Sequence, residues 1–354
     1  MAELNSTLQV GDFTIKNRLV LAPLTRARTD ATRVPNDMMV EYYQQRANAG
    51  LILTEATVIS PKAVGYANTP GLWSQEQAQA WRKIVDAVHA QDAKIVVQLW
   101  HVGRISDPEL LDGDTPVAPS AIQPAGEVSL LRPKRPFVTP RALSHAEIQE
   151  IVVQYKHAAE LAKEAGFDGV ELHAANGYLI DQFLQSKTNV REDEYGGSIE
   201  NRARLLLQVV DAFIEVWGAG RVGVHLAPRG DSHDMGDDNP LATFGYVVEQ
   251  LDQRHVGFIF TREYVAEDSL MPQLRPKFKG VWIANEALTP ESAKQILATE
   301  QADAVSFGKP YIANPDLLHR LENDLPLNEV EFATLYGAGA EGYTDYPTFE
   351  QTQA

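Results

Sequence analysis

The chain has 354 residues, of which 44% are hydrophobic and 8% aromatic, and its formal net charge is −17. This composition is typical of a folded protein with a large core, and so acidic a surface disfavours nucleic acid and anionic membranes as partners. The sequence contains no cysteine, which excludes disulfides, thiolate nucleophiles and cysteine-ligated metals. The start does not resemble a signal peptide and no apolar run is long enough to span a bilayer, so we expect a cytoplasmic protein.

Eight short apolar runs, each followed by a helical pattern, extend through the chain. Most runs are continuous rather than alternating, which is typical of strands buried on both faces, and the intervening helices require parallel pairing. The sequence therefore predicts a (β/α)8 TIM barrel. The eight runs are residues 18–22, 51–55, 94–100, 169–172, 222–226, 256–260, 281–284 and 304–307.

Helix start signals agree with this arrangement. Ser74, Ser144 and Thr289-Pro290 stand where an N-cap is expected. The expected helices are residues 38–49, 75–90, 146–164, 199–216 and 291–298. After the third strand, residues 101–143 form a long connection rich in proline and polar residues, which predicts a capping insertion over the barrel mouth. No linker divides the chain, so residues 1–354 are expected to form a single domain.

Catalytic groups of such barrels lie at the carboxyl ends of the strands. Three chemically matched side chains follow the fourth strand: His173, Asn176 and Tyr178. The first two can donate hydrogen bonds to one oxygen atom, and the tyrosine can supply a weakly acidic proton. This set suits the reduction of an activated double bond. A histidine bonded to a backbone carbonyl is the alternative for His173 alone, and a rim aromatic is the alternative for Tyr178.

At these and other strand ends the sequence resembles the old yellow enzyme family of FMN-dependent ene-reductases, and the resemblance runs from end to end. The motifs that carry it are KNR at 16–18, APLTR at 22–26, QLWH at 98–101, HAANGYL at 173–179, the segment 188–202 and EGYTDYP at 341–347.

The resemblance implies a reaction in which hydride passes from NADPH or NADH through FMN to a small electrophilic alkene, with the two partners alternating at one mouth. His173 and Asn176 would bind the substrate carbonyl, and Tyr178 would protonate the α-carbon. The implied cofactor-binding residues are Pro23, Thr25, Ala56, Gln98, His225, Asn285, Gly308 and Lys309, and the implied pocket walls are Tyr66, Trp100 and Tyr343. A monomer or a homodimer is expected.

Three positions depart from the family pattern. His225 and Lys309 stand where relatives usually carry arginine, and Asn285-Glu286 stands where many carry small residues. We therefore expect either a protonated His225 or a weaker flavin of lower potential, with Arg262 as a candidate to compensate. The alternative function is a repurposed barrel with weakened flavin binding that acts as an isomerase or a small-molecule-binding protein.

Other motifs are given ordinary interpretations. The acidic residues 192–194 are expected to form a solvated loop, and no metal site is assigned. The GxGxxG pattern at 337–342 follows no predicted strand, so it does not indicate a dinucleotide-binding fold. His101 is interpreted as structural.

Overall fold

The computed structural model describes residues 3–353, and its centre is a closed barrel of eight parallel strands. Each strand pairs with the next, and β13 pairs with β3 to complete the ring. The predicted barrel is therefore confirmed, and every predicted run contains or overlaps one of its strands. The strands are β3 (Leu19–Leu21), β4 (Leu51–Leu53), β6 (Lys94–Trp100), β9 (Gly169–Ala174), β10 (Val222–Leu226), β11 (Phe258–Arg262), β12 (Val281–Asn285) and β13 (Ala304–Phe307). A short strand, β5 (Thr57–Val58), extends the edge of β6.

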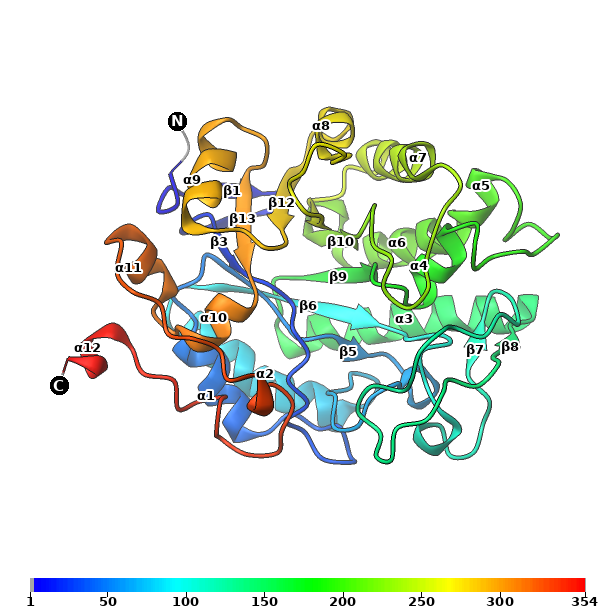
Figure 1. Cartoon of the computed structure of the whole chain (residues 1–354), viewed down its shortest axis with the longest axis horizontal. Coiled ribbons are helices and arrows are strands. Elements are labelled where there is room, and N and C mark those ends of the chain that lie inside the picture. Colours follow the sequence, from blue (N-terminus) through cyan, green and yellow to red (C-terminus); the bar gives the residue numbers. More distant parts are fainter. Residues whose placement is uncertain (1–2, 354) are drawn as a thin grey trace.

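Helices surround the strands (Figure 1). Capping boxes at Ser74, Ser144 and Thr289 begin three of them, at or within one residue of the predicted starts. The longer helices are α1 (Asp37–Gln45), α2 (Gln75–His89), α3 (His145–Ala165), α6 (Arg204–Trp217), α7 (Pro240–Gln253) and α9 (Pro290–Ala298). The shorter ones are α4 (Leu179–Leu184), α5 (Ile199–Arg202), α8 (Met271–Leu274), α10 (Lys309–Ala313), α11 (Leu317–Glu322) and α12 (Phe349–Thr352). None of these described helices is long and apolar enough to cross a membrane.

One predicted helix is divided in the structure. Residues 199–216 form α5 and α6, which are separated at Ala203. The guanidinium of Arg202, the last residue of α5, donates to the carbonyl of Leu184 at the end of α4 and pairs with Asp237 in the loop before α7.

A β-hairpin that the sequence analysis did not identify covers the amino-terminal end of the barrel. Strands β1 (Leu8–Val10) and β2 (Phe13–Ile15) pair in antiparallel fashion. Their apolar side chains Val10, Phe13 and Ile15 pack in one buried cluster with lumen residues such as Phe258 and Ile283. Only the carboxyl end of the barrel is therefore left to hold a site.

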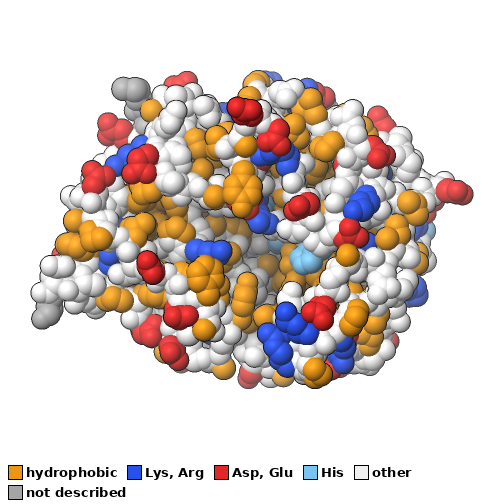
Figure 2. All heavy atoms as spheres, in the orientation of Figure 1, with side chains coloured by type: hydrophobic (Ala, Val, Ile, Leu, Met, Phe, Trp, Pro, Cys, Tyr) orange, Lys and Arg blue, Asp and Glu red, His pale blue; other side chains and the backbone are white. Residues whose placement is uncertain are grey.

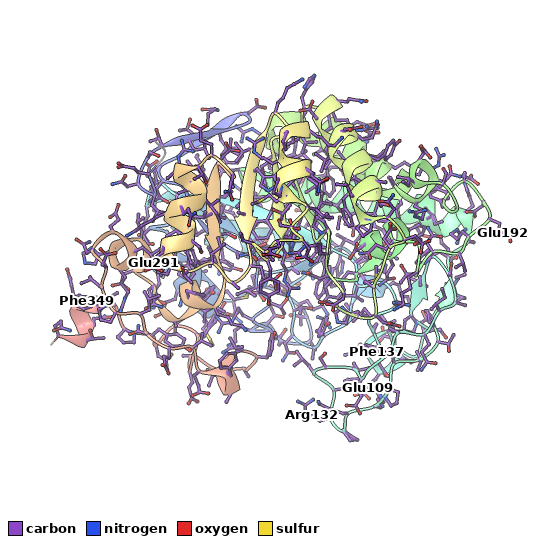
Figure 3. All side chains as sticks on the ribbon, turned by 45° about the horizontal axis from the view of Figure 1, so that its top comes forward. Glu109, Arg132, Phe137, Glu192, Glu291 and Phe349 are labelled. Atoms are coloured by element: carbon purple, nitrogen blue, oxygen red, sulfur yellow. The ribbon has the colours of Figure 1, made fainter. Side chains whose placement is uncertain are left out.

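The segment 101–143 includes the turn Pro108–Leu110 and the strands β7 (Val117–Ala118) and β8 (Arg141–Ala142). Glu109, Arg132 and Phe137 lie together at one corner of the molecule (Figure 3). The segment is tied to the loop after β10, because Arg104 donates to the carbonyls of Ile122 and His233, both at 2.9 Å. These bonds place the segment beside the open end of the barrel.

The packing of side chains inside the closed barrel leads to a prediction for Gly223 in β10. A Cβ added at this glycine would collide with the ring of Phe258, which fills the lower barrel. We expect Gly223→Ala to destabilise the protein by about 1–3 kcal/mol, the usual cost of overpacking a core. Urea denaturation measures this. Gly339→Ala is the control, since a Cβ there meets no atom within 4 Å; equal stabilities of the two variants would contradict the prediction.

Candidate active site

Residues from β9 and the loop after it converge with aromatic side chains at the barrel mouth. The ring centroid of His173 lies 5.1 Å from that of Tyr178 and 6.0 Å from that of Trp100. Asn176 lies between His173 and Tyr178 in the chain. Figure 2 shows a hollow near the middle of this face, with a histidine and several hydrophobic and basic side chains around it.

His173 is a neutral hydrogen-bond donor. Its side chain is buried, and burial together with the nearby positive charge of Arg262 lowers its pKa to about 3. The Nδ1 atom accepts from the backbone N–H of Ala175 at 3.4 Å. In a neutral imidazole the hydrogen is then on Nε2, which can donate to a ligand.

The side chain and backbone of Asn176 are held by two neighbours. Its backbone lies in the left-handed region at φ 58°, which asparagine tolerates better than most residues. Its carbonyl is 2.7 Å from Nδ1 of His233, and its side-chain Oδ1 accepts from Arg262 at 2.8 Å. Arg262 in turn pairs with Glu286 at 2.7 Å. Because Oδ1 is engaged, the Nδ2 hydrogens are the part of the amide left for a ligand.

Tyr178 belongs to an aromatic wall. Its hydroxyl is 2.9 Å from that of Tyr66, and Tyr66 stacks on Trp100 with ring centroids 5.5 Å apart. Burial raises the pKa of Tyr178 well above the usual value, and burial raises that of Tyr66 to about 12. Both phenols are therefore protonated at neutral pH, so Tyr178 has a proton to give.

Tyr343, the third predicted wall residue, has different neighbours. Its side chain is fully buried and stacks on Tyr42 with centroids 4.2 Å apart, beneath the guanidinium groups of Arg26 and Arg28. Within residues 3–353 it makes no ring contact with the aromatic wall around Tyr178. The predicted contact between Tyr343 and the substrate stays a prediction, and no contact of Tyr343 with the aromatic wall supports it.

Three buried polar side chains, Gln98, Glu171 and His225, line the lumen beside and below His173, and we call them the lumen triad. The Nε2 of Gln98 lies 2.7 Å from Oε2 of Glu171 and 3.1 Å from Nδ1 of His225. Since the amide nitrogen can only donate, His225 accepts at Nδ1 and carries its hydrogen on Nε2. That Nε2 is buried and has no partner in the described protein.

The protonated His225 that we considered from the sequence is not what the structure favours. Burial is the largest cause that lowers its pKa well below the usual value, and the positive charge of Arg262 acts in the same direction. A neutral His225 is a donor without a positive charge.

The Nε2–H of His225, which has no partner in the described protein, allows us to ask whether the lumen residues fit a flavin ring. A flavin ring edge offers both donors and acceptors, and the lumen triad presents the Nε2–H of His225 and the amide oxygen of Gln98. Thr25, which follows β3, is partly exposed, whereas Ala56, which follows β4, is buried. The residues present are compatible with the ring, and their contacts with FMN stay predictions.

The predicted phosphate end lies where β12 and β13 finish. Asn285 donates to the carbonyl of Ser306 at 3.2 Å, and Glu286 has a left-handed φ of 106°. A Cβ on Gly308 would come within 2.7 Å of Cδ1 of Leu24, so a larger residue here would displace that side chain. Lys309 is exposed and lies 5.0 Å from the ring centre of Phe332. The lysine is free of salt bridges within the described chain, as a phosphate-binding cation would be.

Sequence reasoning missed three contributors to this site: Glu171, His233 and the contact of Arg262 with Asn176. Glu171 precedes His173 by two residues, so alternation along a strand places both on the lumen face, and this signal was available. His233 lies in a segment without a regular pattern, and only the fold brings it to Asn176.

The pKa of His173 leads to a prediction about pH. Because the pKa is lowered to about 3, the ring stays neutral above about pH 4 and its donor on Nε2 is constant across the neutral range. We expect the ¹⁵N chemical shifts of His173, assigned with His173→Gln, to stay unchanged from pH 5 to 8. A titration within that range would show that the ring is not shielded as the structure indicates.

Comparison with known proteins agrees with this geometry. Residues 3–328 match the model of the NADH:flavin oxidoreductase / NADH oxidase family. The chain is 41% identical to a probable flavin mononucleotide-dependent alkene reductase of Leishmania infantum, over 96% of each chain. It superposes on morphinone reductase in complex with tetrahydroNAD with a TM-score of 0.96 and 45% identity, covering 100% of this chain and 99% of the other.

A second solved structure, the old yellow enzyme homologue from Zymomonas mobilis, gives a TM-score of 0.95 and 42% identity over 98% of this chain and 99% of the other. The chain therefore belongs to the NADH:flavin oxidoreductase / NADH oxidase family, which confirms the old yellow enzyme family predicted from its motifs.

Proposed function

We propose that this FMN-dependent oxidoreductase uses NADPH or NADH to reduce the activated C=C bonds of α,β-unsaturated carbonyl compounds, imides and nitroalkenes. The observation that carries the proposal is the convergence of two neutral donors, His173 Nε2 and Asn176 Nδ2, beside the protonated phenol of Tyr178. Bound FMN supplies the hydride chemistry, because it stores two electrons from the nicotinamide and returns them to the alkene.

The residues proposed to hold FMN come from six strand ends. Pro23, Thr25, Ala56, Gln98 and His225 would contact the ring, with the amide oxygen of Gln98 accepting and Nε2 of His225 donating. Asn285, Gly308 and Lys309 would bind the phosphate end. Lysine is a point charge rather than a bidentate fork, so we expect a looser grip on the phosphate than arginine would give.

The proposed reaction depends on charge that develops at the substrate oxygen. Hydride addition to the β-carbon leaves an enolate, and His173 and Asn176 are oriented as donors before that charge appears. Removing one preorganised donor of this kind typically costs about a hundredfold or more in rate. Tyr178 then gives its proton to the α-carbon, and the hydrogen bond with Tyr66 holds the phenol in place.

Nicotinamide and alkene are proposed to use the same mouth in turn, since the GxGxxG pattern at 337–342 lies in the irregular segment before α12 rather than between a strand and a helix. The complex of morphinone reductase with tetrahydroNAD is compatible with this proposal. We also propose that the chain acts as one domain capped by 101–143, in the cytoplasm, as a monomer or homodimer. The alternative of a repurposed isomerase or binding barrel is not favoured by the family assignment.

The two half-reactions test this function directly. We expect the purified protein to be yellow, to be bleached by NADPH or NADH without oxygen, and to regain its colour when an enone or maleimide is added. Stopped-flow absorbance measures both steps. A colourless protein that cannot be reconstituted with FMN would overturn the proposal.

Tyr178→Phe separates the proton step from the hydride step. The variant keeps the ring against Trp100 but has no acidic hydrogen, so we expect reoxidation by an enone to slow by about a hundredfold or more. Reduction by the nicotinamide should change little, because no proton from Tyr178 is needed there. Tyr66→Phe is the matched control, since it removes the partner hydroxyl and leaves the acid. Equal effects of the two variants on reoxidation would exclude Tyr178 as the proton donor.

A further inference from the structure

Glu171 is a buried carboxyl group that the proposed reaction does not use. It is fully buried on β9, two residues before His173 and on the same lumen face. Its Oε1 atom has no hydrogen-bond partner, and no salt bridge reaches it within residues 3–353. A carboxylate without a cation is unusual in a protein interior, because the charged form loses its hydration.

Gln98 links this carboxyl to His225. Both hydrogens of its amide nitrogen are used, one on Oε2 of Glu171 and one on Nδ1 of His225. The protonation states of the two outer groups are therefore connected through one side chain. The fully buried atoms of the lumen triad that have no partner in the described protein are Oε1 of Glu171 and Nε2 of His225.

Among the described residues, no cation acts on Glu171. On β10, Gly223 stands beside Glu171 and has no side chain. The ring of His225 lies 5.0 Å from that of His173 and 4.6 Å from that of Phe260. From β11 the cation Arg262 acts on both histidines, yet it is paired with Glu286.

Burial raises the pKa of Glu171 to about 8, with the hydrogen bond from Gln98 acting in the opposite direction. At neutral pH the whole lumen triad is therefore uncharged. A negative charge added to a ligand above it would raise the pKa of Glu171 further, since like charges disfavour ionisation.

We propose that Glu171 is the group that couples proton uptake to reduction of the flavin, so that this positioning residue sets how the flavin potential depends on pH. The inference rests on the proposed function. The two electrons come from the reduced nicotinamide. Above the pH at which Glu171 ionises, its carboxylate takes one proton from water as the flavin gains negative charge, and releases it to water when the flavin is reoxidised.

The test is the midpoint potential of the holoenzyme as a function of pH, in wild type and in Glu171→Gln. From near pH 8 upward we expect the wild-type potential to fall by about 30 mV per pH unit more steeply than that of the variant. For a two-electron couple, uptake of one additional proton changes the midpoint potential by about 30 mV per pH unit, because the proton concentration changes tenfold per pH unit. Identical slopes in wild type and variant would overturn the inference.

Asp181→Asn is the matched control. Asp181 on α4 is a second buried carboxyl, with its pKa raised to about 7, and it accepts from Gly177 and Gln185 rather than from the lumen triad. The variant should keep the wild-type slope. If Asp181→Asn flattens the slope as much as Glu171→Gln does, the coupling does not belong to Glu171.

A second readout needs no flavin. A raised pKa means that the folded state holds the proton of Glu171 more tightly than the unfolded state, so stability is lost as pH rises from about 4.5 to about 8. In urea denaturation of the flavin-free protein, wild type should lose stability relative to Glu171→Gln over this range. If the difference in stability between wild type and Glu171→Gln does not change with pH, the inference is overturned. A colourless protein that cannot be reconstituted with FMN would overturn the proposed function alone.

If Glu171→Gln does not fold, the protonation of Glu171 is measured instead by infrared spectroscopy. The sample is the Asp181→Asn variant with ¹³C-labelled glutamate. We expect the C=O band of a protonated glutamic acid at pH 6 and its loss above about pH 8. Absence of that band at pH 6 would overturn the inference.

Discussion

Pairing of β13 with β3 closes the sheet, and the arrangement of the site depends on this closure. Parallel strands in a closed ring direct eight carboxyl ends to one opening, and the hairpin β1–β2 fills the other end. Residues as far apart in the chain as Thr25 and Lys309 are thereby brought to one mouth. Alternation along each strand then decides which of them face the lumen: Gln98 on β6, Glu171 and His173 on β9, and His225 on β10.

Much of this could be predicted from the sequence because the signals are local. Continuous apolar runs identified the strands, and the caps at Ser74, Ser144 and Thr289 identified helix starts. The hairpin β1–β2 escaped notice because an exposed residue stands in the middle of each short strand, so neither strand is a continuous apolar run. For the site, motif spacing predicted that His173, Asn176 and Tyr178 act together. The contacts of His233 and Arg262 with Asn176 join residues 57 and 86 positions apart, and no local pattern encodes them.

Neutral groups dominate the site. His173 and His225 are kept uncharged by lowered pKa values, while Glu171 and Tyr178 are kept uncharged by raised ones. Burial is the largest cause in all four. Uncharged donors in a water-excluded site can still stabilise a developing negative charge, because their dipoles are fixed before the reaction begins. Such a site avoids the cost of burying a permanent cation without a partner.

Arg262 shows where the positive charge of the site is used. Its guanidinium is paired with Glu286, so the pair adds little net charge to the mouth. Its bond to Oδ1 of Asn176 nevertheless withdraws electron density from the amide, and chains of hydrogen bonds strengthen one another in a low dielectric. The Nδ2 hydrogens of Asn176 become better donors as a result. In the proposed reaction the cation therefore acts on the substrate oxygen through Asn176, whereas the neutral His225 is the residue left to face the flavin.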